Sequence, residues 1–162
     1  MRILGVDPGS RATGYGMIET DGMRHRTILF GAVTTSARRP FHQRLLEIFE
    51  GLDTVLRQHP ADVMAIEGVF HSVNVQAALK LGHARGVALV VAALRGLDVR
   101  EYSPLEIKNA VVGFGRAEKI QVQTMVQLIL GLPEIPSPDH AADALAVAIC
   151  HAHRMKGEDV RR

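Results

Sequence analysis

Two acidic residues follow short apolar runs of the kind that form buried strands. Asp7 comes directly after residues 3–6 (ILGV), and Glu67 comes directly after residues 63–66 (VMAI). Ligands of open α/β sheets gather outside the carboxyl ends of the strands, so we expect these two carboxylates to converge. An acid at one strand end is more often a turn-capping residue, and that alternative stays open for each acid taken singly. The similarity of the two runs favours a shared site.

A second pair of candidate ligands lies near the start of the last predicted helix, residues 139–155. His140 and Asp143 are three residues apart and share one face of a helix that is otherwise apolar. Burying an unpaired carboxylate is costly, and a divalent cation is the natural compensation. The alternative is that Asp139 caps the helix and its neighbours interact with the helix dipole. Asp143 lies too deep in the helix for easy capping.

Together, Asp7, Glu67, His140 and Asp143 predict an oxygen-rich site for Mg²⁺ or Mn²⁺. Two such ions in one active site, about 4 Å apart, drive in-line hydrolysis of a phosphodiester: one activates the attacking water and the other stabilises the leaving oxygen. No nucleophilic side chain is then needed. Cys150 is the only cysteine, which excludes an intramolecular disulfide and a thiolate zinc cluster. We expect it to be a packed helix residue.

The elements that must position these residues follow from periodicity and turn signals. We expect strands over residues 1–7, 14–20, 27–35, 63–67 and 98–102, the first three forming an antiparallel meander. Helices are predicted from Phe41 to the His59–Pro60 stop, over 75–94, from the capping box that begins at Ser103, over 117–130 and over 139–155. The fold class is α/β, with a five-stranded mixed sheet flanked by helices. The length of 162 residues indicates one domain, 1–155, and a short C-terminal tail, 156–162, expected to fray.

Charge and hydropathy restrict the class of partner. The chain has 19 basic and 17 acidic residues, and no acid lies between Glu67 and Asp98, where Lys80 and Arg85 fall. This basic stretch suggests a polyanionic partner. The longest apolar run, residues 87–94, is far shorter than the roughly 18 residues of a membrane span. The N-terminus has no signal-peptide pattern, so we expect a cytoplasmic protein without a membrane segment.

Residues 7–16 (DPGSRATGYG) resemble the opening of RuvC-type Holliday junction resolvases. Residues 65–70, 79–86, 111–115, 117–119 and 141–146 resemble further blocks of that family in the same order, so the resemblance covers most of residues 1–153. It implies a ribonuclease H-like fold and a homodimer that binds four-way DNA junctions and makes two symmetric nicks, in recombination and repair. It also implies a junction-binding and branch-migration complex of the RuvA and RuvB type as partner.

The resemblance also assigns residues by motif. It implies metal-binding roles for Asp7, Glu67 and Asp143, with His140 in a ligand position that is Asp in some members. Because an imidazole nitrogen replaces an oxygen there, we expect higher activity with Mn²⁺ than with Mg²⁺. Asp139 is expected to point elsewhere. Candidate DNA-binding residues are the aromatic Phe70, which would stack on an unpaired base, two lysines near the scissile phosphate and three backbone contacts: Lys108, Lys119, Asn74, Lys80 and Arg85.

Other functions fit parts of the pattern. Asp7 with Thr13–Gly14 also resembles the phosphate loop of actin-like ATPases and sugar kinases, but those proteins need a second such domain, for which 162 residues leave no room. A non-catalytic junction-binding scaffold is one remaining alternative, and a compact dimeric interaction module is another. The signature of a scaffold would be a broken acid set, whereas all four positions here hold plausible ligands.

Overall fold

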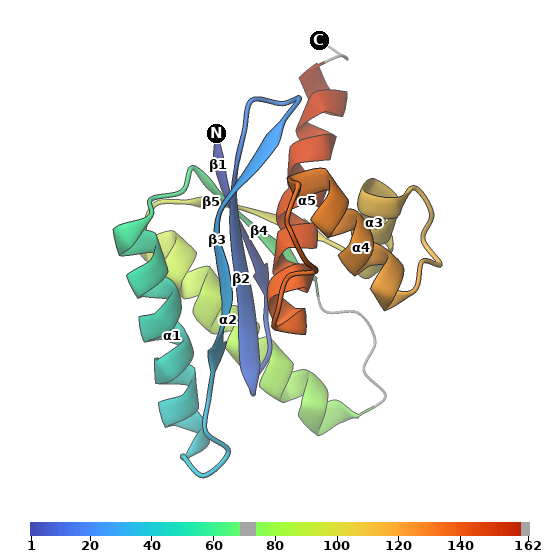
Figure 1. Ribbon diagram of the computed structural model, residues 1–162. Helices are drawn as coiled ribbons and strands as arrows, with labels where there is room; N and C mark the ends of the chain where they lie inside the picture. Colours follow the sequence, from blue (N-terminus) through green and yellow to red (C-terminus); the bar gives the residue numbers. More distant parts are fainter. Residues whose placement is uncertain (69–73, 160–162) are drawn as a thin grey trace.

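The computed structural model describes residues 1–68 and 74–159, with side chains described as far as residue 155. Its centre is one five-stranded sheet with the strand order β3-β2-β1-β4-β5 (Figure 1). β1 (Arg2–Asp7), β2 (Ala12–Thr20) and β3 (His25–Thr34) are antiparallel. β4 (Val63–Glu67) and β5 (Asp98–Tyr102) continue from β1 in parallel. The predicted mixed sheet is confirmed.

Helices cover both faces of the sheet (Figure 1). α1 (Phe41–Gln58) and α2 (Val75–Leu94) pack on one face, around side chains such as Leu4, Met64 and Ile66. α3 (Pro104–Val112), α4 (Lys119–Leu130) and α5 (Asp139–Asp159) pack on the other face, around Ile3 and Ala65. Successive strand residues therefore enter different cores, as the pleat of a strand requires.

Several element boundaries differ from those predicted. β2 and β3 each begin two residues earlier, because Ala12 pairs with Thr34 and Thr20 pairs with His25 across the hairpin. The helix predicted over 117–130 begins at Lys119, where Glu118 and Gln121 form a capping box. α5 continues four residues past the predicted end at 155, so residues 156–159 of the expected tail are helical. The segment contains no proline to stop the helix.

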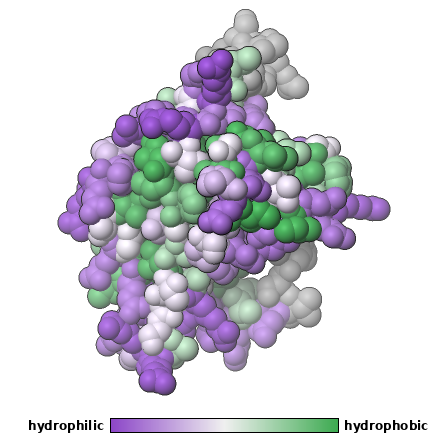
Figure 2. Space-filling model, in the orientation of Figure 1, coloured by the Kyte–Doolittle hydropathy of each residue, from purple (hydrophilic) through white to green (hydrophobic). Residues whose placement is uncertain are grey.

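Surface hydropathy is uneven. On the face shown in Figure 2, hydrophobic residues gather over α4, where Ile120 and Leu128 are exposed. Among the described helices, α2 is long and apolar enough to cross a membrane by length and composition. Its residues Ala84, Ala88 and Val91 are buried against the core, but only 22% of its most apolar 18-residue window is buried.

α5 lies unusually close to β1 and β2 because the strand positions beneath it are glycines. A Cβ atom at Gly5 would overlap the carbonyl oxygen of Ala144, and one at Gly14 would overlap that of His140. The helix contributes small residues to the same contact, since Ala144 and Ala148 are fully buried. Backbone therefore packs on backbone, which brings the first turns of α5 over the end of β1.

The turn between β1 and β2 is tied down on both sides. The hydroxyl of Thr13, which is fully buried, donates to the carbonyl of Gly9 at 2.9 Å. The guanidinium of Arg44, from α1, donates to the carbonyl of Ser10 at 2.5 Å. These bonds fix the direction in which the chain leaves β1, and with it the position of Asp7.

The close packing of α5 predicts the effect of adding one methyl group. Gly5→Ala is expected to lower the free energy of unfolding by about 1–3 kcal/mol, since neither backbone can yield without disturbing the core. The control is Thr124→Ala at an exposed position of α4, away from the contact with α5. This change should raise stability by at most about 0.5 kcal/mol, because alanine is the better helix former. Urea unfolding at one protein concentration measures both; equal effects of the two changes would show that the contact is not tight.

Candidate active site

The four predicted metal ligands come from three elements that meet at one edge of the sheet. Asp7 ends β1 and Glu67 ends β4; these strands are parallel neighbours, with Val6 paired to Ile66 directly before the two acids. His140 and Asp143 lie in the first turns of α5, which the glycine contacts hold over β1 and β2. The predicted convergence of strand-end and helix residues is present.

Three of the four residues already have ligand atoms at chelating separations. One ligand atom from each of Asp7, His140 and Asp143 lies within 4.8 Å of the other two. Nδ1 of His140 is 2.8 Å from Oδ2 of Asp7. The Asp7 and Glu67 carboxyls are close enough for each to influence the pKa of the other. The Asp7 and Asp143 side chains are 15% and 27% exposed, so the donors are partly shielded yet reachable from solvent.

The electrostatics of the cluster favour a bound cation. Burial, together with the nearby charges of Asp7 and Asp143, raises the pKa of Glu67 to about 7. Burial also raises the pKa of Asp7, although the hydrogen bond with His140 opposes that change. Three carboxyl groups this close cannot all ionise cheaply without a positive partner. Carboxylate oxygens with one imidazole nitrogen are a donor set that fits Mg²⁺ or Mn²⁺.

Two lysines face the acids across a cavity of about 270 Å³. Glu67, Asp143, Lys108 and Lys119 line it together with apolar side chains from α3, α4 and α5, namely Pro104, Ile107, Val122 and Ala146. Nζ of Lys119 is 3.0 Å from Oδ2 of Asp143. Burial alone would lower the pKa of Lys119, but its hydrogen bond to Asp143 and the charges of the nearby acids outweigh burial, so the pKa is raised.

Asp139 does not join the cluster of donors. Its carboxylate is 71% exposed and contacts Nζ of Lys119 at 3.4 Å. Its place relative to a bound metal stays a prediction.

The other predicted DNA-binding residues lie outside this cavity. Phe70 lies outside the described residues. The side chain of Asn74 caps α2, accepting a hydrogen bond from the backbone of Ala77 at 3.2 Å. Arg85 is only 19% exposed and forms an ion pair with Glu101 of β5 at 2.5 Å. Lys80 is exposed on α2. Contact between these residues and DNA stays a prediction.

Some supporting residues were not identified from the sequence. Arg44 and the glycines beneath α5 position the site without belonging to it. The alternation of Gly14 and Gly16 in β2 was a usable signal, because two missing side chains on one strand face permit a close neighbour. Cys150 is buried, and burial raises its pKa to about 11, as expected for a packed and unreactive thiol.

The raised pKa of Glu67 predicts how stability depends on pH without metal. A carboxyl whose pKa is higher in the folded state contributes stability at low pH that is lost as pH rises from about 4.5 through about 7. In EDTA at pH 8, Glu67→Gln should therefore be more stable than wild type by roughly 1–3 kcal/mol, relative to their difference at pH 4. Glu50→Gln, an exposed site on α1, is the control. Parallel pH profiles for wild type and Glu67→Gln would contradict the assignment.

Comparison with known proteins gives a consistent result. The family model for "Crossover junction endodeoxyribonuclease RuvC" matches residues 3–151. Proteins of that name from Koribacter versatilis and Geobacter sulfurreducens are 53% and 51% identical, over 94% and 100% of this chain and 93% and 98% of their own lengths.

Solved structures agree with the sequence relatives. The structure of T. thermophilus RuvC in complex with Holliday junction substrate matches with a TM-score of 0.93 and 36% identity, over 98% of this chain and 96% of that one. The yeast mitochondrial Holliday junction resolvase matches with a TM-score of 0.69 at 13% identity, over 98% and 80% of the two chains, and shares the fold. The predicted ribonuclease H-like architecture is confirmed. Since its family model spans almost the whole chain and full-length relatives are about half identical, the chain belongs to the RuvC family of crossover junction endodeoxyribonucleases.

Proposed function

We propose that this chain is a structure-selective endonuclease that resolves four-way (Holliday) DNA junctions by two symmetric nicks. The observation that carries the proposal is the meeting of Asp7, His140 and Asp143 beside Glu67, at the carboxyl edge of the sheet. The T. thermophilus relative, solved with a Holliday junction, supports the choice of substrate. Intact ligands at all four positions favour this function over a non-catalytic scaffold.

The chain's own residues prepare the site for phosphodiester hydrolysis. Asp7, Glu67, His140 and Asp143 would hold two Mg²⁺ or Mn²⁺ ions, which supply an activated water and stabilise the leaving 3′ oxygen. His140 orients the Asp7 carboxyl through the 2.8 Å contact. Lys108 and Lys119 add two positive charges to the cavity, where a phosphate needs them.

The acids and the lysines have complementary tasks on a polyanion. DNA is negatively charged and the site contains three carboxyl groups, so repulsion between the phosphates and the carboxylates would oppose binding. Two lysines on the wall of the same cavity offset part of that repulsion. The site therefore requires the two lysines to bind the DNA backbone and the carboxylates to bind the metal.

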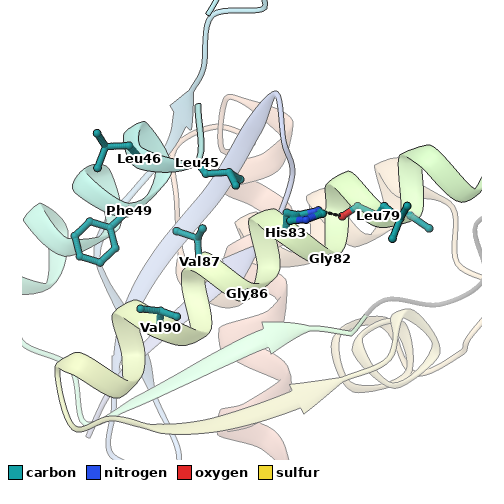
Figure 3. Close-up of a pocket in the computed structure, with 10 residues that line it drawn as sticks. Leu45, Leu46, Phe49, Leu79, Gly82, His83, Gly86, Val87 and Val90 are labelled. Carbon is teal, nitrogen blue, oxygen red and sulfur yellow. Dashed lines mark hydrogen bonds between the residues drawn. The ribbon is translucent and has the colours of Figure 1, made fainter. Parts of the chain in front are cut away.

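We propose a homodimer, which the two-fold task and an apolar groove on the opposite face of the sheet both support. Two nicks placed symmetrically across a junction suit two active sites related by a two-fold axis. A groove of about 730 Å³ lies between α1 and α2 (Figure 3). Leu46, Leu79 and Val90 line it and are each more than half exposed.

The groove also has room for the close approach of a helix. Gly82 and Gly86 lie one turn apart on α2 between the apolar side chains of Figure 3, and an added Cβ at either would meet nothing. We infer that α2 of a second copy occupies this groove, which accounts for an apolar helix face that the core leaves exposed.

The remaining assignments rest on family membership. We propose residues 1–155 as a single nuclease domain, although α5 runs across that boundary to Asp159. We also propose that the protein acts in the cytoplasm, with a junction-binding and branch-migration complex of the RuvA and RuvB type.

Asp7→Asn tests the proposed chemistry. The substitution is nearly isosteric and removes one ligand charge, so nicking should fall at least about 100-fold while junction binding persists. The assay uses a labelled four-way junction and matched linear duplex with Mg²⁺ or Mn²⁺. Wild type should make paired nicks in the junction alone. Binding without cleavage by wild type would favour a scaffold, and equal cutting of linear duplex would indicate a general nuclease.

His140→Asp tests the metal preference. Exchange of a nitrogen ligand for a carboxylate makes the site harder and more negative, so the ratio of the nicking rate in Mn²⁺ to that in Mg²⁺ should fall several-fold. Single-turnover rates on the junction measure this ratio. An unchanged ratio would mean that His140 does not select the metal.

Leu79→Glu tests the dimer interface. A charge placed in the groove should raise the dimer dissociation constant by about 100-fold or more, because burying it in an apolar contact is costly. Leu128→Glu, at an equally exposed apolar site on α4, is the matched control and should leave the dimer intact. Analytical ultracentrifugation separates the outcomes, and a Leu79→Glu dimer as stable as wild type would place the interface elsewhere.

A further inference from the structure

Lys119 makes contact with a predicted metal ligand. It is the first residue of α4, and its Nζ atom lies 3.0 Å from Oδ2 of Asp143 and 3.4 Å from Oδ2 of Asp139. Asp139 and Asp143 are one turn apart on α5, so both carboxylates face the same ammonium. Lys119 therefore contacts one oxygen of a carboxylate that the proposed function assigns to a metal ion.

The ammonium weakens the attraction of the Asp143 carboxylate for a divalent ion. A dication bound by that carboxylate would lie close to Nζ, and the two like charges would repel each other. The lysine is free to leave, because its side chain is 53% exposed and the Asp139 carboxylate is 71% exposed. Ion pairs with such exposure contribute little to stability.

We propose that Lys119 competes with the metal for Asp143, and that metal binding releases Lys119 into the cavity as a ligand for a DNA phosphate. This inference rests on the proposed function, since it assumes that Asp143 binds metal. Because coupling between two binding events is reciprocal, a phosphate that draws Lys119 away from Asp143 also strengthens metal binding. Metal binding is therefore stronger when DNA is bound.

Lys108 provides an internal comparison. It lines the same cavity and carries the same charge, but within residues 1–68 and 74–155 no ion pair joins its ammonium to a carboxylate. A general effect of positive charge on metal affinity would appear in variants of either lysine. Competition for Asp143 would appear in variants of Lys119 alone.

The first test is calorimetric titration of the metal-free protein with Mn²⁺, without DNA. Lys119→Met should bind Mn²⁺ roughly three- to tenfold more tightly than wild type, because the competing ammonium is gone. Lys108→Met should remain within about twofold of wild type. Equal or weaker binding by Lys119→Met would overturn the proposal. Failure of wild type to bind Mn²⁺ at all would instead overturn the metal-dependent function.

A second test keeps the natural residue in place. The chain has four lysines, Lys80, Lys108, Lys119 and Lys156, so lysine side-chain carbon signals in NMR are few enough to assign by substitution. Adding Mg²⁺ should move the Cε signal of Lys119 toward the position of a solvated lysine and leave that of Lys80 unchanged. A subsequent addition of four-way junction DNA should move the Lys119 signal again. A Lys119 signal that does not move when Mg²⁺ is added would contradict the release of Lys119 from Asp143.

Discussion

The candidate active site depends on the contact of α5 with the β1–β2 hairpin. Adjacent layers in α/β proteins are normally about 10 Å apart because side chains fill the space between them. Glycine at positions 5 and 14 removes the strand side chains, and the α5 backbone fills their place. This contact lets His140 and Asp143 of the helix reach Asp7 of the strand. Substitution of the acids would change the chemistry, but loss of the contact would separate them.

Bringing these groups together has an energetic consequence. Three carboxyl groups and an imidazole share a partly shielded edge of the sheet, and without a metal they must neutralise one another. Glu67 has a raised pKa, Asp7 shares a hydrogen bond with His140, and Asp143 pairs with the ammonium of Lys119. Each compensation is local and reversible. The site therefore attracts cations more strongly than the same residues would if they lay farther apart.

Sequence reasoning succeeded where a local pattern determines the structure. The acids at the ends of two apolar runs, the capping box at Ser103 and the five strands all follow from spacing and residue type, and the structure confirms them. The predicted strand boundaries were wrong where pairing between strands sets the ends of a strand, as at the starts of β2 and β3. Contacts between residues far apart in the sequence could not be predicted either. Nothing near Arg85 in the sequence indicates that it pairs with Glu101 of β5.

The two faces of the sheet carry different candidate sites. α3, α4 and α5 build the acidic cavity and its lysines, whereas α1 and α2 present the apolar groove. The central claim is that the acids and His140 hold the metal, and anomalous diffraction from crystals grown with Mn²⁺ and junction DNA tests it most directly. We predict two Mn²⁺ peaks bounded by Asp7, Glu67, His140 and Asp143. Peaks confined to other residues would contradict the account.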